Sequence, residues 1–159
     1  MADNLAFRLT NRVANPVLLR LLRTRAGRRP GRRLGVLRYT GARTGTPHEL
    51  VVMYARTEAT VWIAVGGAEH KSWWRNLAAP ADVVLWLAGE QLTGRAVAVE
   101  GAAQPDEARR GLIAYLARLP TAARSLGVRD RREPTQVAAA AAQSVLVRVD
   151  LRPEPDTAA

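Results

Sequence analysis

The apolar residues of this 159-residue chain fall mostly in short runs that alternate with polar residues. Such runs, rich in branched and aromatic side chains and bounded by Gly, Pro and Thr, are typical of strands joined by turns. The run at 91–100 contains Gly94, which predicts a bulge that breaks the strand. The pattern predicts six strands, at residues 34–39, 50–56, 60–65, 82–87, 91–100 and 144–151.

Helical spacing of apolar residues occurs in a few stretches only. Residues 5–22 predict one or two amphipathic helices with a kink at Pro16, and 25–33 predicts a basic loop. A proline followed by two acids opens a helix at 105–119, apolar at Leu112, Ile113, Leu116 and Leu119. Shorter helices are expected at 72–79 and 135–143, with an irregular arginine-rich segment at 121–133.

Strands in consecutive hairpins with helices between and outside them predict an antiparallel, mainly β fold with peripheral helices, most simply a small barrel. We expect three parts. Residues 1–33 form an N-terminal amphipathic helix and basic loop, residues 34–151 form the barrel domain, and residues 152–159 form a flexible tail.

The turn between the first two predicted strands carries several hydrogen-bond donors and few acceptors. Its glycine N–H groups are expected to be unshielded, so the turn suits a phosphate or a carboxylate. A solvated hairpin loop is the alternative for this stretch alone. The polar side chains of the turn are Thr40, Arg43, Thr44, Thr46 and His48.

A second stretch, residues 65–77, has the same character. It follows a strand, contains Gly66 and Gly67, and is expected to open a short helix with Ser72 at the N-cap beside Lys71. The positive end of the helix would then add to the anion-binding character of the stretch.

The order of these motifs, Gly-X-Arg-Thr-Gly-X-Pro, two strands, Gly-Gly and Trp-Trp-Arg-Asn-Leu before a proline, resembles the deazaflavin-dependent nitroreductase and quinone reductase family. The resemblance implies an FMN-binding-like split β-barrel. It also implies an oxidoreductase that transfers a hydride between the deazaflavin coenzyme F420 and a small conjugated acceptor, which is a quinone, an enone or a nitro compound.

The same resemblance assigns the site residues. Strand residues 50–53 would line the ring, backbone groups of 64–67 would approach it, and the basic turn would hold the anionic end of the coenzyme. The resemblance names no proton donor; the side chains themselves offer Tyr54, His70 and Lys71, and a surface role is favoured for His70. Trp74 either contacts the cofactor or fills the core. The cofactor-binding candidates are Arg43, Thr44, Gly45, His48, Val51, Met53, Val65, Gly66, Gly67, Lys71, Trp74 and Asn76.

This chain departs from the family pattern at three places. Ala42 stands where a basic residue is usual, and His48 stands where arginine is frequent. The tyrosines that shape the substrate pocket of some members are missing around Ala122 and Ser125. The prodrug-reducing activity of those members is therefore not expected.

Composition narrows the class further. The chain has no cysteine and two histidines, which argues against disulfides, thiolate chemistry and a zinc site, so no metal is expected. No long apolar run opens the sequence, so we expect a cytoplasmic protein. The net charge of +10 is carried almost wholly by arginine, and residues 20–33 are dense in it. Contact of residues 5–33 with an anionic membrane is therefore an open alternative, whereas nucleic acid is disfavoured because no aromatics are interleaved.

Three other hypotheses stay open. One is a related barrel that binds FMN or FAD in the same way. Another is a non-enzymatic or cofactor-free barrel that binds an anionic partner through its arginine-rich N-terminal segment. The third is a homodimer, since Trp62 and Trp86 fit an interface equally well as a core.

Overall fold

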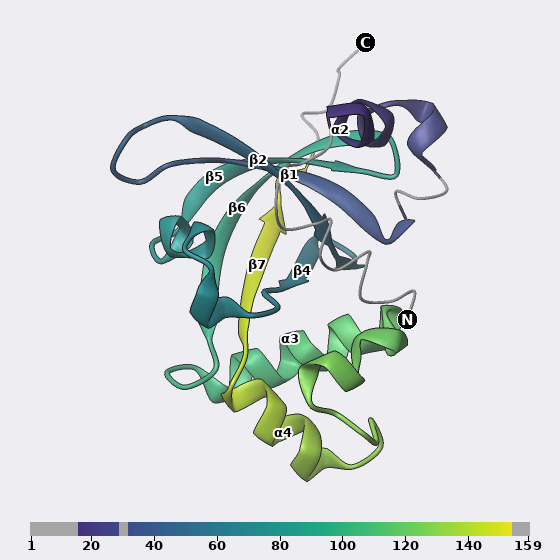
Figure 1. The fold of residues 1–159 in the computed structure, drawn as a ribbon, viewed down its shortest axis with the longest axis vertical. Helices are drawn as coiled ribbons and strands as arrows, with labels where there is room; N and C mark the ends of the chain where they lie inside the picture. The colour runs from purple at the N-terminus through teal and green to yellow at the C-terminus, as the bar shows by residue number, and fades with distance from the viewer. Residues whose placement is uncertain (1–15, 29–31, 154–159) are drawn as a thin grey trace. The chain divides into compact units, whose positions relative to one another are not determined.

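The computed structural model describes residues 16–28 and 32–153. Seven strands follow one another in the sheet order β2-β1-β5-β6-β7-β4-β3, and their registered pairs are antiparallel. The expected antiparallel, mainly β fold with peripheral helices is confirmed (Figure 1). The strands are β1 Leu34–Thr40, β2 Pro47–Met53, β3 Ala55–Thr57, β4 Thr60–Ala64, β5 Ala81–Leu87, β6 Glu90–Glu100 and β7 Val145–Leu151.

Three α-helices are described: α2 Pro16–Arg23, α3 Pro105–Arg118 and α4 Pro134–Ala142. Both α3 and α4 begin with a proline, whose fixed φ suits the first helical turn. Asp106 and Glu107 lie in the first turn of α3, where their negative charges interact favourably with the positive end of the helix dipole. Short 3-10 helices are η1 Arg25–Arg28, η3 Ala68–His70, η4 Trp73–Leu77, η5 Pro120–Ala122 and η6 Arg124–Leu126.

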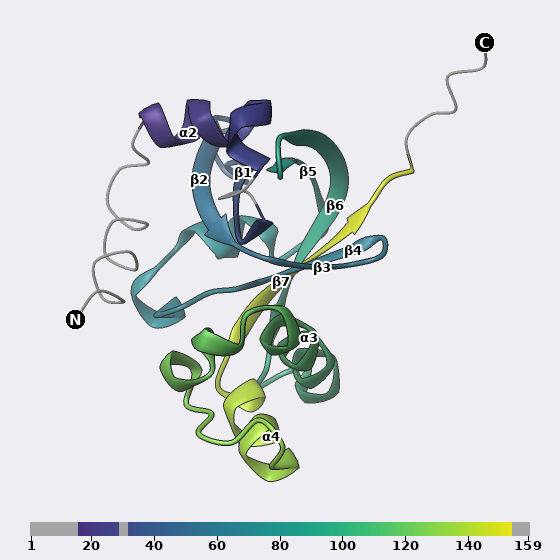
Figure 2. The ribbon, with the colours of Figure 1, turned by 90° about the vertical axis from the view of Figure 1, so that its right-hand side faces the viewer.

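The chain divides into two compact units. Unit 1 contains the described residues up to Met53 together with Val83–Leu92. In it β1 pairs with β2 on one edge and with β5 on the other, and α2 lies against β1 (Figure 2). Its core is a cluster of four buried side chains, one of them from α2, and two further leucines of α2 pack against it. The cluster is Leu22, Val36, Val51 and Trp86, and the two leucines are Leu18 and Leu19.

Unit 2 contains Tyr54–Asp82 and the residues from Thr93 onward. Here β7 pairs with both β4 and β6, α3 packs on β3, β4 and β7, and α4 lies beside α3 (Figures 1 and 2). A Cβ at Gly111 would come within 2.5 Å of the Trp62 ring. The backbone of α3 therefore rests directly on that ring.

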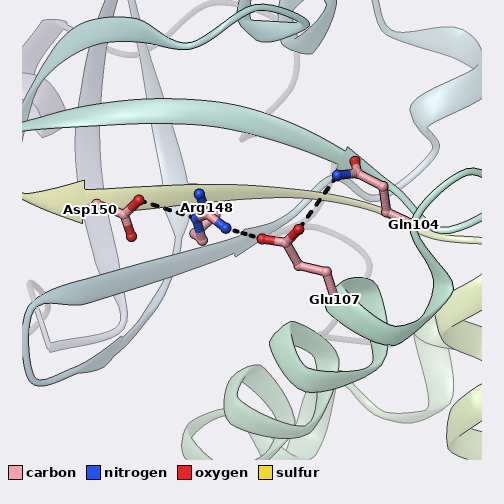
Figure 3. Close-up of polar contacts among 4 residues, drawn as sticks. All are labelled: Gln104, Glu107, Arg148 and Asp150. Carbon is pink, nitrogen blue, oxygen red and sulfur yellow. Dashed lines mark hydrogen bonds and ion pairs between the residues drawn. The ribbon is translucent and has the colours of Figure 1, made fainter.

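An ionic network ties α3 to β7 within unit 2. Arg148 lies between Glu107 and Asp150, and Gln104 donates to the far side of Glu107 (Figure 3). The Arg148–Asp150 and Gln104–Glu107 distances are 3.2 Å and 3.4 Å. The Glu107 side chain is only 20% exposed. Water and salt therefore screen the attraction between Glu107 and Arg148 less than they screen an ordinary surface ion pair.

Two strand predictions were wrong in detail. The strand expected at 50–56 is two strands, because β2 pairs with β1 from Pro47 to Met53 and the chain then leaves to form β3 on β4. The bulge expected at Gly94 is absent. Gly94 pairs in register with Leu151, and a side chain there would come within 2.7 Å of Val149 and 2.8 Å of the Asp150 carbonyl oxygen.

Several other expectations are corrected. The helix expected at 72–79 is the five-residue η4, and part of the predicted basic loop 25–33 is the 3-10 helix η1. The irregular segment 121–133 contains η5 and η6. Ile113, placed on the apolar face of α3, is 54% exposed, whereas Trp62 and Trp86 are each only 7% exposed. Both tryptophans are core residues of their units, so neither offers an exposed apolar face.

The N-terminal predictions are covered in part. Residues 16–23 are helical, and α2 begins at Pro16. The rest of the helix expected at 5–22, and most of the tail expected at 152–159, lie outside the described residues. The division into parts 1–33, 34–151 and 152–159 stays a prediction. Within the described ranges, no helix is both long enough and apolar enough to span a membrane.

Candidate functional site

The turn that joins β1 to β2 is closed by its own backbone. The Gly41 N–H donates to the Thr46 carbonyl at 2.8 Å, and the Gly45 N–H donates to the Gly41 carbonyl at 2.9 Å. The Thr46 N–H donates to Thr44 Oγ1 at 3.3 Å. The expectation of unshielded glycine N–H groups was therefore wrong, and an anion at this turn has to be bound by side chains.

Two polar side chains of the turn converge on Gly41. An ideal Cβ on Gly41 would lie 2.6 Å from Thr44 Oγ1 and 3.3 Å from His48 Nε2. His48 is held by stacking on Tyr39, with ring centroids 5.3 Å apart and an interplanar angle of 26°. The missing side chain of Gly41 thus leaves a small cradle that a hydroxyl and an imidazole border.

Arg43 lies at the exposed tip of the same turn. Within residues 16–28 and 32–153 it forms neither an ion pair nor a hydrogen bond. The nearest carboxylate in sequence, Glu49, is already engaged by two other arginines. The five N–H donors of Arg43 are therefore available to an anion from solution.

Sequence reasoning missed the cluster beside this turn, in which Arg23 and Arg38 share Glu49. Arg38 contacts Glu49 Oε1 through Nε at 2.7 Å and through Nη2 at 2.6 Å, and Arg23 pairs with Oε2. Both guanidinium groups also lie over Trp86, 4.5 Å and 4.9 Å from the ring centroid. The sequence contains one sign of this cluster, because Glu49 is the only acidic residue between Asp3 and Glu58 and is therefore the only nearby carboxylate in sequence for these arginines.

The second predicted stretch forms a local network in unit 2. The Ala68 carbonyl accepts a hydrogen bond from Trp74 Nε1 at 3.1 Å and another from the Lys71 N–H at 3.2 Å. Asn76 Nδ2 donates to the Trp73 carbonyl at 2.9 Å. Trp74 is only 7% exposed. Its indole therefore fixes the loop that carries Lys71, which agrees with the core interpretation of this residue.

Lys71 is half-buried. Burial lowers the pKa of its ammonium group, and the neighbouring carboxylate of Glu69 opposes this shift only in part. Ser72 stands at the N-cap of η4 but makes no capping hydrogen bond through its side chain. The predicted anion site at a helix N-terminus is therefore not formed as expected, because η4 has only five residues and its cap is not closed.

The remaining candidates lie in varied environments. The Val51 side chain belongs to the unit 1 core, and Met53 is half-buried at the end of β2. Tyr54 is 6% exposed. Val65 is buried and donates its N–H to the Val145 carbonyl at 2.9 Å. Gly66 is half-buried, and Gly67 is exposed.

Most of the predicted site residues fall into two groups in the structure. Arg43, Thr44, Gly45 and His48 lie together on the β1–β2 turn of unit 1. The residues from Val65 to Asn76 lie together in unit 2.

The antiparallel sheet with peripheral helices agrees with the split-barrel fold that the sequence had predicted. The family model described as F420H(2)-dependent quinone reductase matches residues 17–132. The chain belongs to this family. It is a deazaflavin-dependent oxidoreductase with F420 as its coenzyme, as the motif order had predicted.

Solved structures share the fold. An F420-H2 dependent reductase, FDR-A, superposes with a TM-score of 0.54 at 19% identity, over 74% of this chain and 94% of its own. A protein solved as a domain-swapped dimer gives the same score and identity, over 74% of this chain and 80% of its own. A conserved hypothetical protein of Mycobacterium tuberculosis gives 0.52 at 17% identity, over 89% and 82%. No curated protein matches the chain.

Proposed function

We propose that the β1–β2 turn binds the anionic end of F420, with Arg43 as the main contact and Thr44 and His48 as further donors. The supporting observation is that Arg43 has no partner among the described residues, while Thr44 Oγ1 and His48 Nε2 border the cradle over Gly41. A guanidinium, a hydroxyl and an imidazole fit phosphate and carboxylate groups, which accept charge-assisted hydrogen bonds.

The bound deazaflavin supplies the hydride chemistry, so the protein has to bind, orient and exclude water. The acceptor we propose is a small conjugated molecule, and the family description favours a quinone over an enone or a nitro compound. In unit 2, the residues from Val65 to Asn76 provide a loop held by Trp74, on which Gly66 and Gly67 leave the backbone accessible.

Lys71 and Tyr54 are the proposed proton donors. The lowered pKa of Lys71 makes its ammonium a stronger acid than a solvent-exposed lysine. Lys71→Met should therefore lower kcat and remove the alkaline limb of its pH profile, whereas Tyr54→Phe tests the second candidate in the same assay. An unchanged pH profile in both variants would reject both assignments.

The deciding experiment is a tryptophan-fluorescence titration with oxidised and reduced F420, with FMN alongside. Arg43→Ala should weaken F420 binding roughly 10- to 100-fold, the equivalent of one charge-assisted hydrogen bond or pair. Arg109→Ala is the matched control, because Arg109 is an exposed arginine on α3. Equal F420 affinity of the Arg43 variant and the wild type would contradict the turn assignment, and binding of FMN alone would favour a flavin-dependent barrel.

We also propose that the protein is a homodimer. The support is a structural neighbour solved as a domain-swapped dimer, with a TM-score of 0.54. Light scattering coupled to size-exclusion chromatography measures the mass directly, and a mass near 17.3 kDa at all concentrations would reject the dimer.

Two predictions from the sequence stay open. Contact of residues 5–33 with an anionic membrane is tested by co-sedimentation with vesicles of anionic and neutral lipid. A cytoplasmic location is tested by fractionation of the cells that express the protein. Binding to neutral and anionic vesicles alike would contradict the electrostatic argument for the membrane contact.

A further inference from the structure

The segment that follows α3, from Pro120 to Glu133, borders two adjoining cavities in unit 2. One has a volume of about 600 Å³ and is lined by Arg124, Gly127 and Arg129. The other, of about 540 Å³, is also lined by Arg124 and Arg129, together with Asp130, Arg131 and Arg132. We refer to the four arginines 124, 129, 131 and 132 and the hollows they border as the arginine pocket.

The backbone under the arginine pocket is held at several points. Gln136 Oε1 accepts hydrogen bonds from two consecutive N–H groups, those of Arg129 at 3.0 Å and Asp130 at 3.1 Å. The Val128 N–H donates to the Ala123 carbonyl at 2.9 Å, and the Val128 side chain is fully buried. These contacts present the arginines from a fixed segment, which lowers the entropy cost of binding.

The reversal at Gly127 explains how several arginines reach the same hollow. Gly127 caps η6 with a φ of 80°, in the left-handed region that side chains other than glycine rarely adopt. The chain therefore turns back between Arg124 and Arg129, and both line both cavities.

Only one of the four arginines has an evident structural use. Arg131 Nη1 donates to the Leu116 carbonyl at 3.2 Å and so satisfies an acceptor in the last turn of α3. In the described part of the chain, the side chains of Arg124, Arg129 and Arg132 form no hydrogen bond or ion pair. Asp130, the carboxylate among them, accepts the Arg132 backbone N–H at 2.9 Å.

Arg124, Arg129 and Arg132 are exposed, and the one carboxylate in the lining, Asp130, forms an ion pair with none of them among the described residues. Their mutual repulsion is partly screened by water, and a bound anion would reduce it further. Arg23 and Arg38 of unit 1 differ from these arginines, because they share the carboxylate of Glu49. A cluster of unpaired arginines around a hollow of ligand size is what recognition of phosphate or carboxylate groups requires.

We propose that the arginine pocket is a second anion-binding site, which takes a small organic molecule with at least two negative charges on phosphate or carboxylate groups. Arg124 and Arg129 bind the anionic groups, and Arg132 adds a third positive charge at the rim. The pocket is formed within unit 2 and does not depend on the assignment of the Arg43 turn.

The test is isothermal titration of the full chain at low salt with two probes, inorganic pyrophosphate and the tricarboxylate tricarballylate. Arg124→Gln/Arg129→Gln should weaken binding of the preferred probe at least 10-fold. The control Arg109→Gln/Arg110→Gln removes the same charge from exposed positions on α3 and should bind like the wild type. Either order of probe affinity supports the pocket, and the order identifies the anionic group.

Two results would overturn the proposal. One is the absence of saturable binding of both probes by the wild-type chain. The other is equal weakening in the pocket variant and in the control, which would mean a general effect of net charge. Thermal unfolding guards against misfolding, because the ligand-free pocket variant should be at least as stable as the wild type and should lose the stabilisation by the probe. F420 affinity measured on the same variants separates this proposal from the role of Arg43.

Discussion

Trp86 and Trp62 are equally buried, at 7% exposure each, but different kinds of groups lie on their rings. In unit 1, Trp86 carries the guanidinium groups of Arg23 and Arg38 on its ring, and Glu49 neutralises part of their charge. In unit 2, Trp62 is covered by the backbone of α3 at Gly111. The first arrangement depends on charge and the second on close packing. Salt and pH should therefore affect them differently.

The largest effect is expected for Trp62→Ala, which removes the ring on which α3 rests. Loss of a buried tryptophan costs about 3–5 kcal/mol of unfolding free energy. Urea unfolding followed by circular dichroism measures it. Trp73→Ala is the control, because Trp73 is half-buried and its loss should cost clearly less. Equal losses would mean that α3 does not depend on the Trp62 ring.

Tyr115 tests whether the core under α3 depends on a neutral side chain. It lies four residues after Gly111 on the same helix, and burial raises its pKa to about 12. Because the folded pKa exceeds the unfolded one, its stabilisation is complete below pH 10 and is lost as the pH rises toward 12. The loss amounts to about 2–3 kcal/mol.

The measurement is the unfolding free energy of the wild type and of Tyr115→Phe as a function of pH. The variant keeps the ring and has no proton to lose, so the two curves should run in parallel near neutrality and separate above pH 10. Parallel curves at all pH values would show that the Tyr115 hydroxyl reaches solvent in the folded state.

Gly111→Ala should lower the unfolding free energy, although a glycine-to-alanine substitution inside a helix usually raises it. Alanine normally stabilises a helix interior by about 0.5–1 kcal/mol relative to glycine. Here its Cβ would lie 2.5 Å from the Trp62 ring, so we expect a loss of about 1–3 kcal/mol. In the Trp62→Ala background the same change should become neutral or stabilising, and a double-mutant cycle measures this coupling. Additive effects would contradict the contact.

The smallest effect is expected for Glu49→Gln, which breaks the charge balance over Trp86. Removal of the Glu49 carboxylate leaves the guanidinium groups of Arg23 and Arg38 next to each other without a negative charge between them. Arg23 Nε is also buried without a hydrogen-bond partner. Because the group is partly exposed, the loss is about 1–2 kcal/mol, and it should shrink in high salt. Glu100→Gln, at an exposed position of β6, is the control. A loss that does not depend on salt would argue for packing instead of charge.

Much of the fold was readable from the sequence because its signals are local. Pro105 with two following acids fixed the start of α3, and glycine and proline placed the β1–β2 turn. The break between β2 and β3 was not readable. The run from Val51 to Arg56 is uniformly strand-like, and the chain changes partner from β1 to β4 for reasons of tertiary structure.

The binding roles given to the site residues stay predictions, whereas the turn itself and the family were predicted from the sequence. Sequence order identified the cationic turn and the family. It did not show that the N–H groups of Gly41 and Gly45 are used inside the turn, since this depends on the folded backbone. Arginine density alone was also a poor guide. In the dense segment 20–33, Arg23 is paired, whereas the arginines around Gly127 have no carboxylate partner within the described residues.

The sheet order places β1 between β2, which follows it at once, and β5, which comes about forty residues later in the chain. During synthesis at roughly 5–20 residues per second, one edge of β1 therefore stays unpaired for several seconds after its hairpin has emerged. An unpaired edge of this kind readily accepts a strand from another chain. The order of translation thus creates an interval in which neighbouring nascent chains on one messenger can exchange β5, and faster elongation between residues 54 and 82 shortens it.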